Sequence, residues 1–238
     1  MISLSRVTVV PVISECERQE ALQVLRATYE REKRWVADGN KVFSPDDLDR
    51  FDVAWFLARR NREPVGVLRV LFNPPLEVYA QYGFQPVPGA NFDVTEFLKR
   101  SRVAEIGRFA VLPEHRKNHY IAAALMRAAA RDTLERGFTH YVTDIFEGEQ
   151  HSPYLFHTRV MGFEPVATHD VGELNCPNRR VTMVLDLQAA YRRLRRSGGW
   201  LFRYLTADWS EALHRRLLGE ETKAVEPRAP LFADAAMA

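Results

Sequence analysis

Hydrophobic and polar positions in the first third of the chain follow a helical pattern and then a strand pattern. Ser14 and Glu17, three residues apart, form a capping box, and apolar residues then recur at helical spacing, so residues 15–35 are predicted to form an amphipathic helix. The acidic segment VFSPDDLDRFD contains Pro45 and predicts an irregular loop. The apolar runs VAWFLARR and VGVLRVL flank NREP and predict an antiparallel hairpin, with Arg69 in the middle of its second strand.

The remainder of the chain predicts strands and helices in alternation. Residues 74–92 carry four prolines and two glycines and are predicted to form a long loop. The segments that follow are, in order, a short helix (FDVTEFLKR), a strand (VAEIGRFAVL), a helix stopped by Gly137 (HYIAAALMRAAARDTLERG), a strand (HYVTDIF), a helix (SPYLFHTRV) and two strands (GFEPVATHDV and RRVTMVLDL). This order predicts an α/β domain with a central mixed sheet that helices cover on its faces.

The charge pattern limits the classes of function. The formal net charge is +2, from 33 basic and 31 acidic residues, which argues against a general nucleic-acid binder. Positive charge gathers in the C-terminal region, where it would suit an acidic partner or would simply form a solvated helix face. We expect one domain at residues 1–188, a basic helical extension at 189–218 and a flexible tail at 219–238.

Membrane insertion and metal chemistry find no support in the sequence. No apolar run approaches the roughly 20 residues that a membrane-spanning helix needs, and the N-terminus lacks a basic region followed by a long apolar one. The two cysteines, Cys16 and Cys176, lack metal-ligand spacing and are expected to be free thiols. We therefore expect a cytoplasmic protein that holds no metal.

The strand VAEIGRFAVL carries the first candidate chemistry. Glu105 and Arg108, three residues apart, would point to opposite faces of a regular strand. A β-bulge near Gly107 would bring both side chains to one face and release a backbone N–H group from the sheet. Freed N–H donors beside a carboxylate are the groups that acyl transfer to an amine requires.

The loop PEHRKNHY leads directly from this strand into a helix. Unpaired N–H groups and the helix dipole at such an N-terminus favour a phosphate, and Arg116, Lys117 and His119 add positive charge. The alternative is an ordinary connection from strand to helix whose basic side chains are solvated.

The segment FAVLPEHRKNHYIAAALMRAA resembles the acyl-donor motif of the GNAT N-acyltransferase superfamily, and MGFEPV resembles its later Gly-Phe strand entry. In that motif a strand, an Arg-Gly-x-Gly-x-Gly/Ala loop and a helix hold the pyrophosphate or phosphopantetheine of the donor. This chain has Lys117, Asn118, His119 and Tyr120 in place of the glycines, and only Ala122 fills a small-residue position. The resemblance implies a GNAT-like fold whose donor is the acyl-phosphopantetheine of acyl carrier protein, with acyl-coenzyme A as the alternative.

Other motifs resemble the LuxI-type autoinducer synthases and the related N-acyl amino acid synthases. DLDRFD resembles their Asp-x-[Phe/Tyr]-Asp signature, GVLRVL their Gly-x-x-Arg strand, and EIGR their Glu-x-Ser-Arg, with Gly107 in place of serine. The spacing from Tyr29 to Trp35 is similar to their aromatic-to-tryptophan pattern. The resemblance implies a polar catalytic cluster made of Asp49, Asp52, Arg69, Glu105 and Arg108.

The same resemblance implies binding residues for the donor and for the acceptor. Tyr29, Trp35 and Phe146 are expected at the substrate, and no general acid is assigned. The residues expected to hold the acyl donor are Phe109, Val111, Arg116, Lys117, His119, Tyr120 and Ala122.

Taken together, the resemblance implies transfer of a long-chain fatty acyl group from acyl carrier protein to the amino group of a small amino acid. One alternative is an acyl-homoserine-lactone synthase that uses S-adenosylmethionine. Others are an acetyl-coenzyme A N-acetyltransferase, or a non-catalytic GNAT protein that binds an acyl carrier. The Gly107 replacement, the FEGEQHSPYLFHTRV segment and the GELNCPNRR insertion resemble the amino acid synthases more closely.

Overall fold

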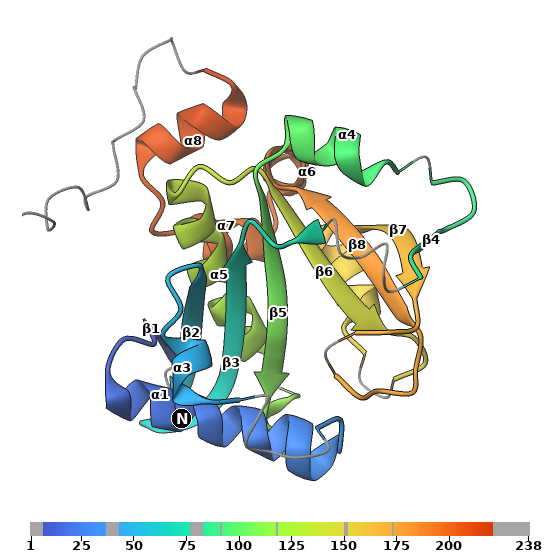
Figure 1. The fold of residues 1–238 in the computed structure, drawn as a ribbon. Coiled ribbons are helices and arrows are strands. Elements are labelled where there is room, and N and C mark those ends of the chain that lie inside the picture. Colours follow the sequence, from blue (N-terminus) through green and yellow to red (C-terminus); the bar gives the residue numbers. More distant parts are fainter. Residues whose placement is uncertain are drawn as a thin grey trace, which may run out of the picture.

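The structure is a computed structural model that describes residues 7–36, 43–76, 83–90, 92–117, 119–149, 152–172 and 174–220. Its centre is an eight-stranded sheet in the order β1-β2-β3-β5-β6-β8-β7-β4 (Figure 1). The strands are β1 (Val7–Pro11), β2 (Val53–Arg60), β3 (Glu63–Phe72), β4 (Gln85–Pro86), β5 (Val103–Val111), β6 (His140–Phe146), β7 (Glu164–His169) and β8 (Arg180–Asp186). Only β5 and β6 pair in parallel within this sheet, which confirms the predicted mixed sheet.

Helices cover both faces of the sheet. They are α1 (Glu15–Leu25), α3 (Pro45–Leu48), α4 (Val94–Arg100), α5 (His119–Glu135), α6 (Leu187–Ser197), α7 (Trp200–Thr206) and α8 (Glu211–Leu218), with two π-helical segments, η1 (Arg26–Glu32) and η4 (Phe156–Met161), and the 3-10 turn η3 (Pro113–His115). Among them, α5 packs on one face through a core that includes Leu68, Ile106 and Leu125, and α1 packs on the other through a core that includes Leu25 and Val67.

The predicted N-terminal helix exists, but its last two turns are not α-helical. The Ser14 hydroxyl accepts a hydrogen bond from the Glu17 amide, and the Glu17 carboxylate accepts one from the Ser14 amide, so the predicted capping box is confirmed. After Leu25 the chain continues as η1 and ends at Glu32 instead of residue 35. A π-helical turn adds one residue per turn and is often found at functional sites.

Three elements differ from the sequence-based expectation. The segment expected to be an irregular loop contains α3, because Ser44 and Asp47 form a second capping box with Pro45 at the first helical position. The edge strands β1 and β4 were not predicted.

One feature of the sheet places the site. β5 and β6 pair only as far as Glu105 and Val142, and beyond that point the two strands diverge (Figure 1).

The C-terminal helices α6 to α8 confirm a helical C-terminal region, while the expected tail falls almost wholly outside the described residues. Within the described part of the chain, no helix is long and apolar enough to cross a membrane.

Candidate active site

The predicted β-bulge is present in β5, one residue beyond Gly107. Val67 of β3 pairs with Ala110, and Arg69 pairs with Gly107, so one β3 residue faces both Arg108 and Phe109. Arg108 has φ +49°, which is unusual for a residue with a side chain and marks local strain. The bulge brings Glu105 and Arg108 to the same cavity, as the sequence predicted.

Glu105 forms an ion pair with Arg69 in this cavity. Arg69 Nη2 lies 2.6 Å from Glu105 Oε1, and Arg69 is only 9% exposed. A Cβ atom on Gly107 would lie 2.7 Å from the same carboxylate oxygen and 3.1 Å from Arg69 Nη2. Glycine at position 107 therefore leaves the space that the ion pair occupies.

The strand register places further polar side chains on the same side of the sheet, here called the site face. Directly paired residues point to one face, and the pairs Leu71–Glu105, Glu105–Val142, Asp144–Thr182 and Arg180–His169 link five strands in this way. The site face is defined by Arg69, Glu105, Asp144, Arg180 and His169, which all line one cavity of about 340 Å³.

The aromatic residues expected at the substrate also line this cavity. Tyr29 of η1 is buried, and its hydroxyl donates a long hydrogen bond of 3.4 Å to the Phe109 carbonyl at the bulge. Burial raises the pKa of Tyr29, although the charges of nearby arginines oppose this shift. Trp35 and Phe146 pack together with their ring centroids 4.3 Å apart. Tyr29, Trp35 and Phe146 thus form an aromatic wall beside the bulge.

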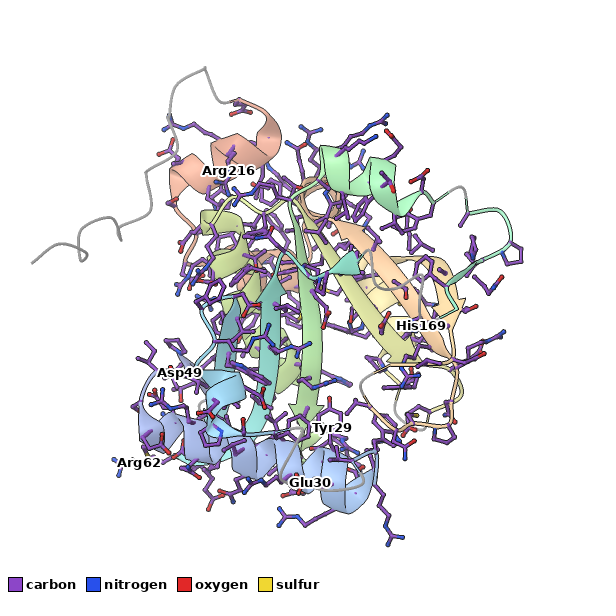
Figure 2. The ribbon with its side chains drawn as sticks, in the orientation of Figure 1. Tyr29, Glu30, Asp49, Arg62, His169 and Arg216 are labelled. Carbon is purple, nitrogen blue, oxygen red and sulfur yellow. The ribbon has the colours of Figure 1, made fainter. Side chains whose placement is uncertain are left out.

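The two acids of the DLDRFD segment behave differently from each other. Asp52 forms a two-bond ion pair with Arg50, which lines the cavity, and the hydrogen bonds from Arg50 lower the pKa of Asp52. Asp49 caps the end of α3 (Figure 2), and its 75% exposed side chain pairs with Arg18 of α1. The expectation that Asp49 joins the polar cluster around Glu105 is not met, because the α3 turn directs it to the surface.

The expected donor-binding residues separate into two groups. Phe109, Val111 and Arg116 line the cavity, and the Arg116 guanidinium forms a two-bond ion pair with Glu32 of η1, at 2.6 and 2.5 Å. Lys117, His119, Tyr120 and Ala122 lie outside this lining.

Tyr120 has a different neighbourhood from the expected one. Its ring contacts Trp200 and Tyr204 of α7, with centroid distances of 5.5 and 6.2 Å. These contacts direct the Tyr120 ring toward the C-terminal helices.

Sequence reasoning missed a second ion pair on the site face. His169 Nε2 lies 3.2 Å from the Asp144 carboxylate, whose other oxygen accepts a hydrogen bond of 2.6 Å from the Thr182 hydroxyl. Burial alone would lower the pKa of His169, but the hydrogen bond and charge of Asp144 outweigh it, so the pKa is raised. Polar residues within the apolar strands HYVTDIF and VATHDV were the available signal.

Another ion pair joins η1 to the segment after β6. Lys33 Nζ contacts Glu149 Oε1, and the Lys33 ammonium lies 5.5 Å from the centroid of the Trp35 ring. Both charged residues line the cavity. The Lys33–Glu149 pair therefore connects the two sides of the cavity beside the aromatic wall.

The fold and the site together define an acyltransferase of the α/β class. The defining features are the divergent β5–β6 pair, the strand–loop–helix unit that follows β5 and the carboxylate beside a β-bulge. The model of the acetyltransferase (GNAT) family matches residues 18–163, more than half of the chain. The chain belongs to the GNAT family and is an N-acyltransferase.

Solved structures support the same fold. FeeM, an N-acyl amino acid synthase from uncultured soil microbes, is similar with a TM-score of 0.60 and 16% identity, over 84% of this chain and 98% of FeeM. The PaiA N-acetyltransferase from Thermoplasma acidophilum, in complex with coenzyme A, is similar with a TM-score of 0.51 and 12% identity, over 76% of this chain and 99% of that one. A search of curated proteins finds no match.

Proposed function

We propose that this protein transfers a long-chain acyl group from acyl carrier protein to the amino group of an amino acid and releases an N-acyl amino acid. The observation that carries this proposal is the Arg69–Glu105 ion pair beside the β5 bulge, inside a cavity with an aromatic wall. The structural similarity to FeeM supports the choice of an amino acid as acceptor.

Glu105 is the proton acceptor in this proposal. An amine attacks a thioester only as the free base, so a carboxylate must take a proton from it directly or through water. Arg69 holds the Glu105 carboxylate at 2.6 Å and fixes its orientation. Glu105 and Gly107 lie on the same side of β5 and both line the cavity, which is where the attacking amine is proposed to bind.

The donor thioester is proposed to lie along β5 beyond Glu105. There β6 no longer pairs with β5, so the strand edge offers backbone groups to an extended ligand such as the two-amide phosphopantetheine arm. The N–H groups at the Arg108–Phe109 bulge are the proposed donors to the developing oxyanion.

The proposed reaction is a single exchange at the thioester carbonyl. The acceptor nitrogen forms the C–N bond, the C–S bond breaks, and the electron pair leaves on sulfur. Glu105 receives the amine proton, and the carrier thiolate takes up a proton when it departs. A thiol is acidic enough, with a pKa of about 8.5, for its thiolate to leave without a strong acid.

Acyl carrier protein is the preferred donor because the loop is poorly suited to a diphosphate. The loop lacks glycines, and its Arg116 is already paired with Glu32. Exposed basic residues remain for an acidic carrier, namely Lys117 and, in the last turn of α6, Arg195 and Arg196. Such charges would steer association with the carrier more than they would fix its affinity.

Product analysis by mass spectrometry tests the proposal. Purified protein is given palmitoyl–acyl carrier protein or palmitoyl-coenzyme A, together with the twenty common amino acids and S-adenosylmethionine. The expected product is an N-palmitoyl amino acid, formed at least tenfold faster from the carrier. A lactone product would refute the amino acid acceptor, and equal rates from both donors would refute the preference for the carrier.

A further inference from the structure

Arg180, the first residue of β8, is a buried cation in the wall of the active-site cavity. It is 3% exposed and lines the cavity. Its Nη1 donates to the Asp170 carbonyl at 2.7 Å and its Nη2 to the Leu174 carbonyl at 2.5 Å. The guanidinium carbon lies 5.0 Å from the centroid of the Phe146 ring.

The segment between β7 and β8 is wrapped closely around this guanidinium. A Cβ atom on Gly172 would lie 2.7 Å from Arg180 Nε and 3.0 Å from its Cζ. The hydrogen bonds to the two carbonyl oxygens and the contact with the Phe146 ring therefore hold the guanidinium in one orientation. A guanidinium fixed in this way is pre-organised for a planar anion such as a carboxylate.

Arg180 has no counter-charge among the residues that the structure describes. Within the described residues, no carboxylate lies within 4 Å of its guanidinium. The acids that line the cavity each have a basic partner: Glu105 with Arg69, Asp144 with His169 and Glu149 with Lys33. A buried guanidinium with five N–H donors and only two carbonyl acceptors is unfavourable unless an anion joins it.

The position of Arg180 relative to the bulge indicates which anion this is. Arg180 pairs with Phe146 across β8 and β6, and β6 diverges from β5 beyond Glu105. The cavity therefore has the Glu105 carboxylate and the bulge on its β5 side and the Arg180 cation on its β8 side. A small molecule with an amine at one end and a carboxylate at the other matches this separation of charges.

We propose that Arg180 binds the carboxylate of the acceptor amino acid and so selects amino acids over other amines. This inference rests on the proposed function. The amine end then faces Glu105 and the thioester, while the carboxylate is paired with the guanidinium against the face of Phe146.

The test compares each amino acid with its carboxamide, which keeps the amine and loses the negative charge. The acceptors are the three amino acids that the wild-type protein acylates fastest, each measured against its own amide with palmitoyl–acyl carrier protein. The readout is the ratio of kcat/KM for acid and amide, because a purely structural role would change both values equally. Arg180→Met is expected to lower this ratio at least tenfold, mainly through KM for the amino acid.

Two further variants make the result decisive. Arg180→Lys keeps the charge without the fork and is expected to lower the ratio less than Arg180→Met, so the inference remains testable if the methionine variant does not fold. Arg179→Met is the matched control, because Arg179 is half exposed and pairs with Glu147 outside the cavity. It should leave the ratio unchanged.

The two proposals fail in different ways. A wild-type protein that acylates no amino acid would overturn the proposed function, and this inference with it, whereas amides acylated as fast as the amino acids would overturn only the role of Arg180. A wild-type preference for amino acids that persists in Arg180→Met and Arg180→Lys would overturn only the role of Arg180.

Discussion

At the residue scale, the site depends on one missing carbon atom. Gly107 faces the Arg69–Glu105 ion pair so closely that a Cβ atom would lie 2.7 Å from the carboxylate oxygen. Its φ angle is not in the left-handed region, so the backbone itself would accept a side chain. Glycine at position 107 is therefore needed for the position of the Glu105 carboxylate and not for the backbone conformation of β5.

Gly107→Ala is expected to lower acyl transfer about tenfold and to change the free energy of unfolding by less than about 1 kcal/mol, since the displaced atoms are the ends of flexible side chains. Steady-state kinetics and urea unfolding measure the two effects.

Gly66→Ala is the matched control for this change. A Cβ atom there would lie 3.1 to 3.2 Å from the Ala110 carbonyl, Ile121 and Leu125, in the core under α5. It should destabilise the protein and keep the turnover rate of the folded fraction. Full activity in Gly107→Ala would contradict this account of the glycine.

How far the site residues could be predicted depends on whether their signal is local. Glu105 and Arg108 were correctly expected at one cavity because a bulge near a glycine follows from four adjacent positions in one strand. Asp49 was misplaced because the spacing of its motif does not show that the α3 turn directs it outward. Asp144 and His169 were missed because they meet only through the register of β6, β8 and β7.

At the element scale, an ion pair joins η1 to the residue that follows η3. The Arg116–Glu32 pair links the loop after β5 to the end of the N-terminal helical segment. The existence of that helix could be predicted from its cap and its spacing. Its π-helical turns could not, because the same apolar residues satisfy either helical form until the sheet fixes Tyr29 against the bulge.

The second π-helical segment, η4, contains a buried neutral histidine. His157 is 2% exposed, and its Nδ1 lies 3.0 Å from the Pro153 carbonyl, to which it donates as the neutral imidazole. Burial lowers the pKa of His157 to about 4, below the ordinary 6.5, and the Pro153 hydrogen bond offsets only part of this shift.

The folded protein should therefore lose stability through His157 as pH falls from 6.5 toward 4. In this window the unfolded chain takes up a proton that the folded protein does not, so stability rises with pH, by about 3 kcal/mol over the full window.

Urea unfolding at several pH values, compared with His157→Asn, isolates this effect. The asparagine variant keeps an N–H near Pro153 but cannot titrate, so its stability should fall less steeply with acid. Parallel pH profiles for the two proteins would contradict the assignment of His157 as a buried neutral group.

At the scale of the whole molecule, the C-terminal helices are attached by arginines. Arg192 donates to the Leu217 and Leu218 carbonyls, Arg193 to carbonyls at the end of η4, and Arg216 to the Leu134 carbonyl near the end of α5. Figure 2 shows Arg216 on α8 at the opposite end of the molecule from Tyr29.

The positive charge of residues 189–218 and their helical structure could both be anticipated from composition and spacing. The hydrogen bonds from several of these arginines to the last carbonyls of distant helices could not be anticipated. The acceptors lie about 25 to 80 residues away in sequence. Several arginines of residues 189–218 therefore hold the C-terminal helices in place. Arg195 and Arg196 remain the better candidates for the proposed contact with acyl carrier protein.

The two faces of the sheet differ in the kind of side chain that they carry. The face under α5 is an apolar core with residues such as Leu134, 3% exposed, whereas the site face carries the ion pairs around the cavity. Stability and chemistry should therefore respond to different substitutions.

Glu105→Gln tests the central claim most directly, because the amide keeps the size of the side chain and a hydrogen bond to Arg69 but cannot take a proton. Formation of the N-palmitoyl amino acid is expected to fall at least 100-fold, about 3 kcal/mol in activation free energy, while the protein stays folded. Leu134→Ala, with a stability cost of about 2–5 kcal/mol, should keep its turnover rate below its melting temperature. Full activity in Glu105→Gln would contradict the account.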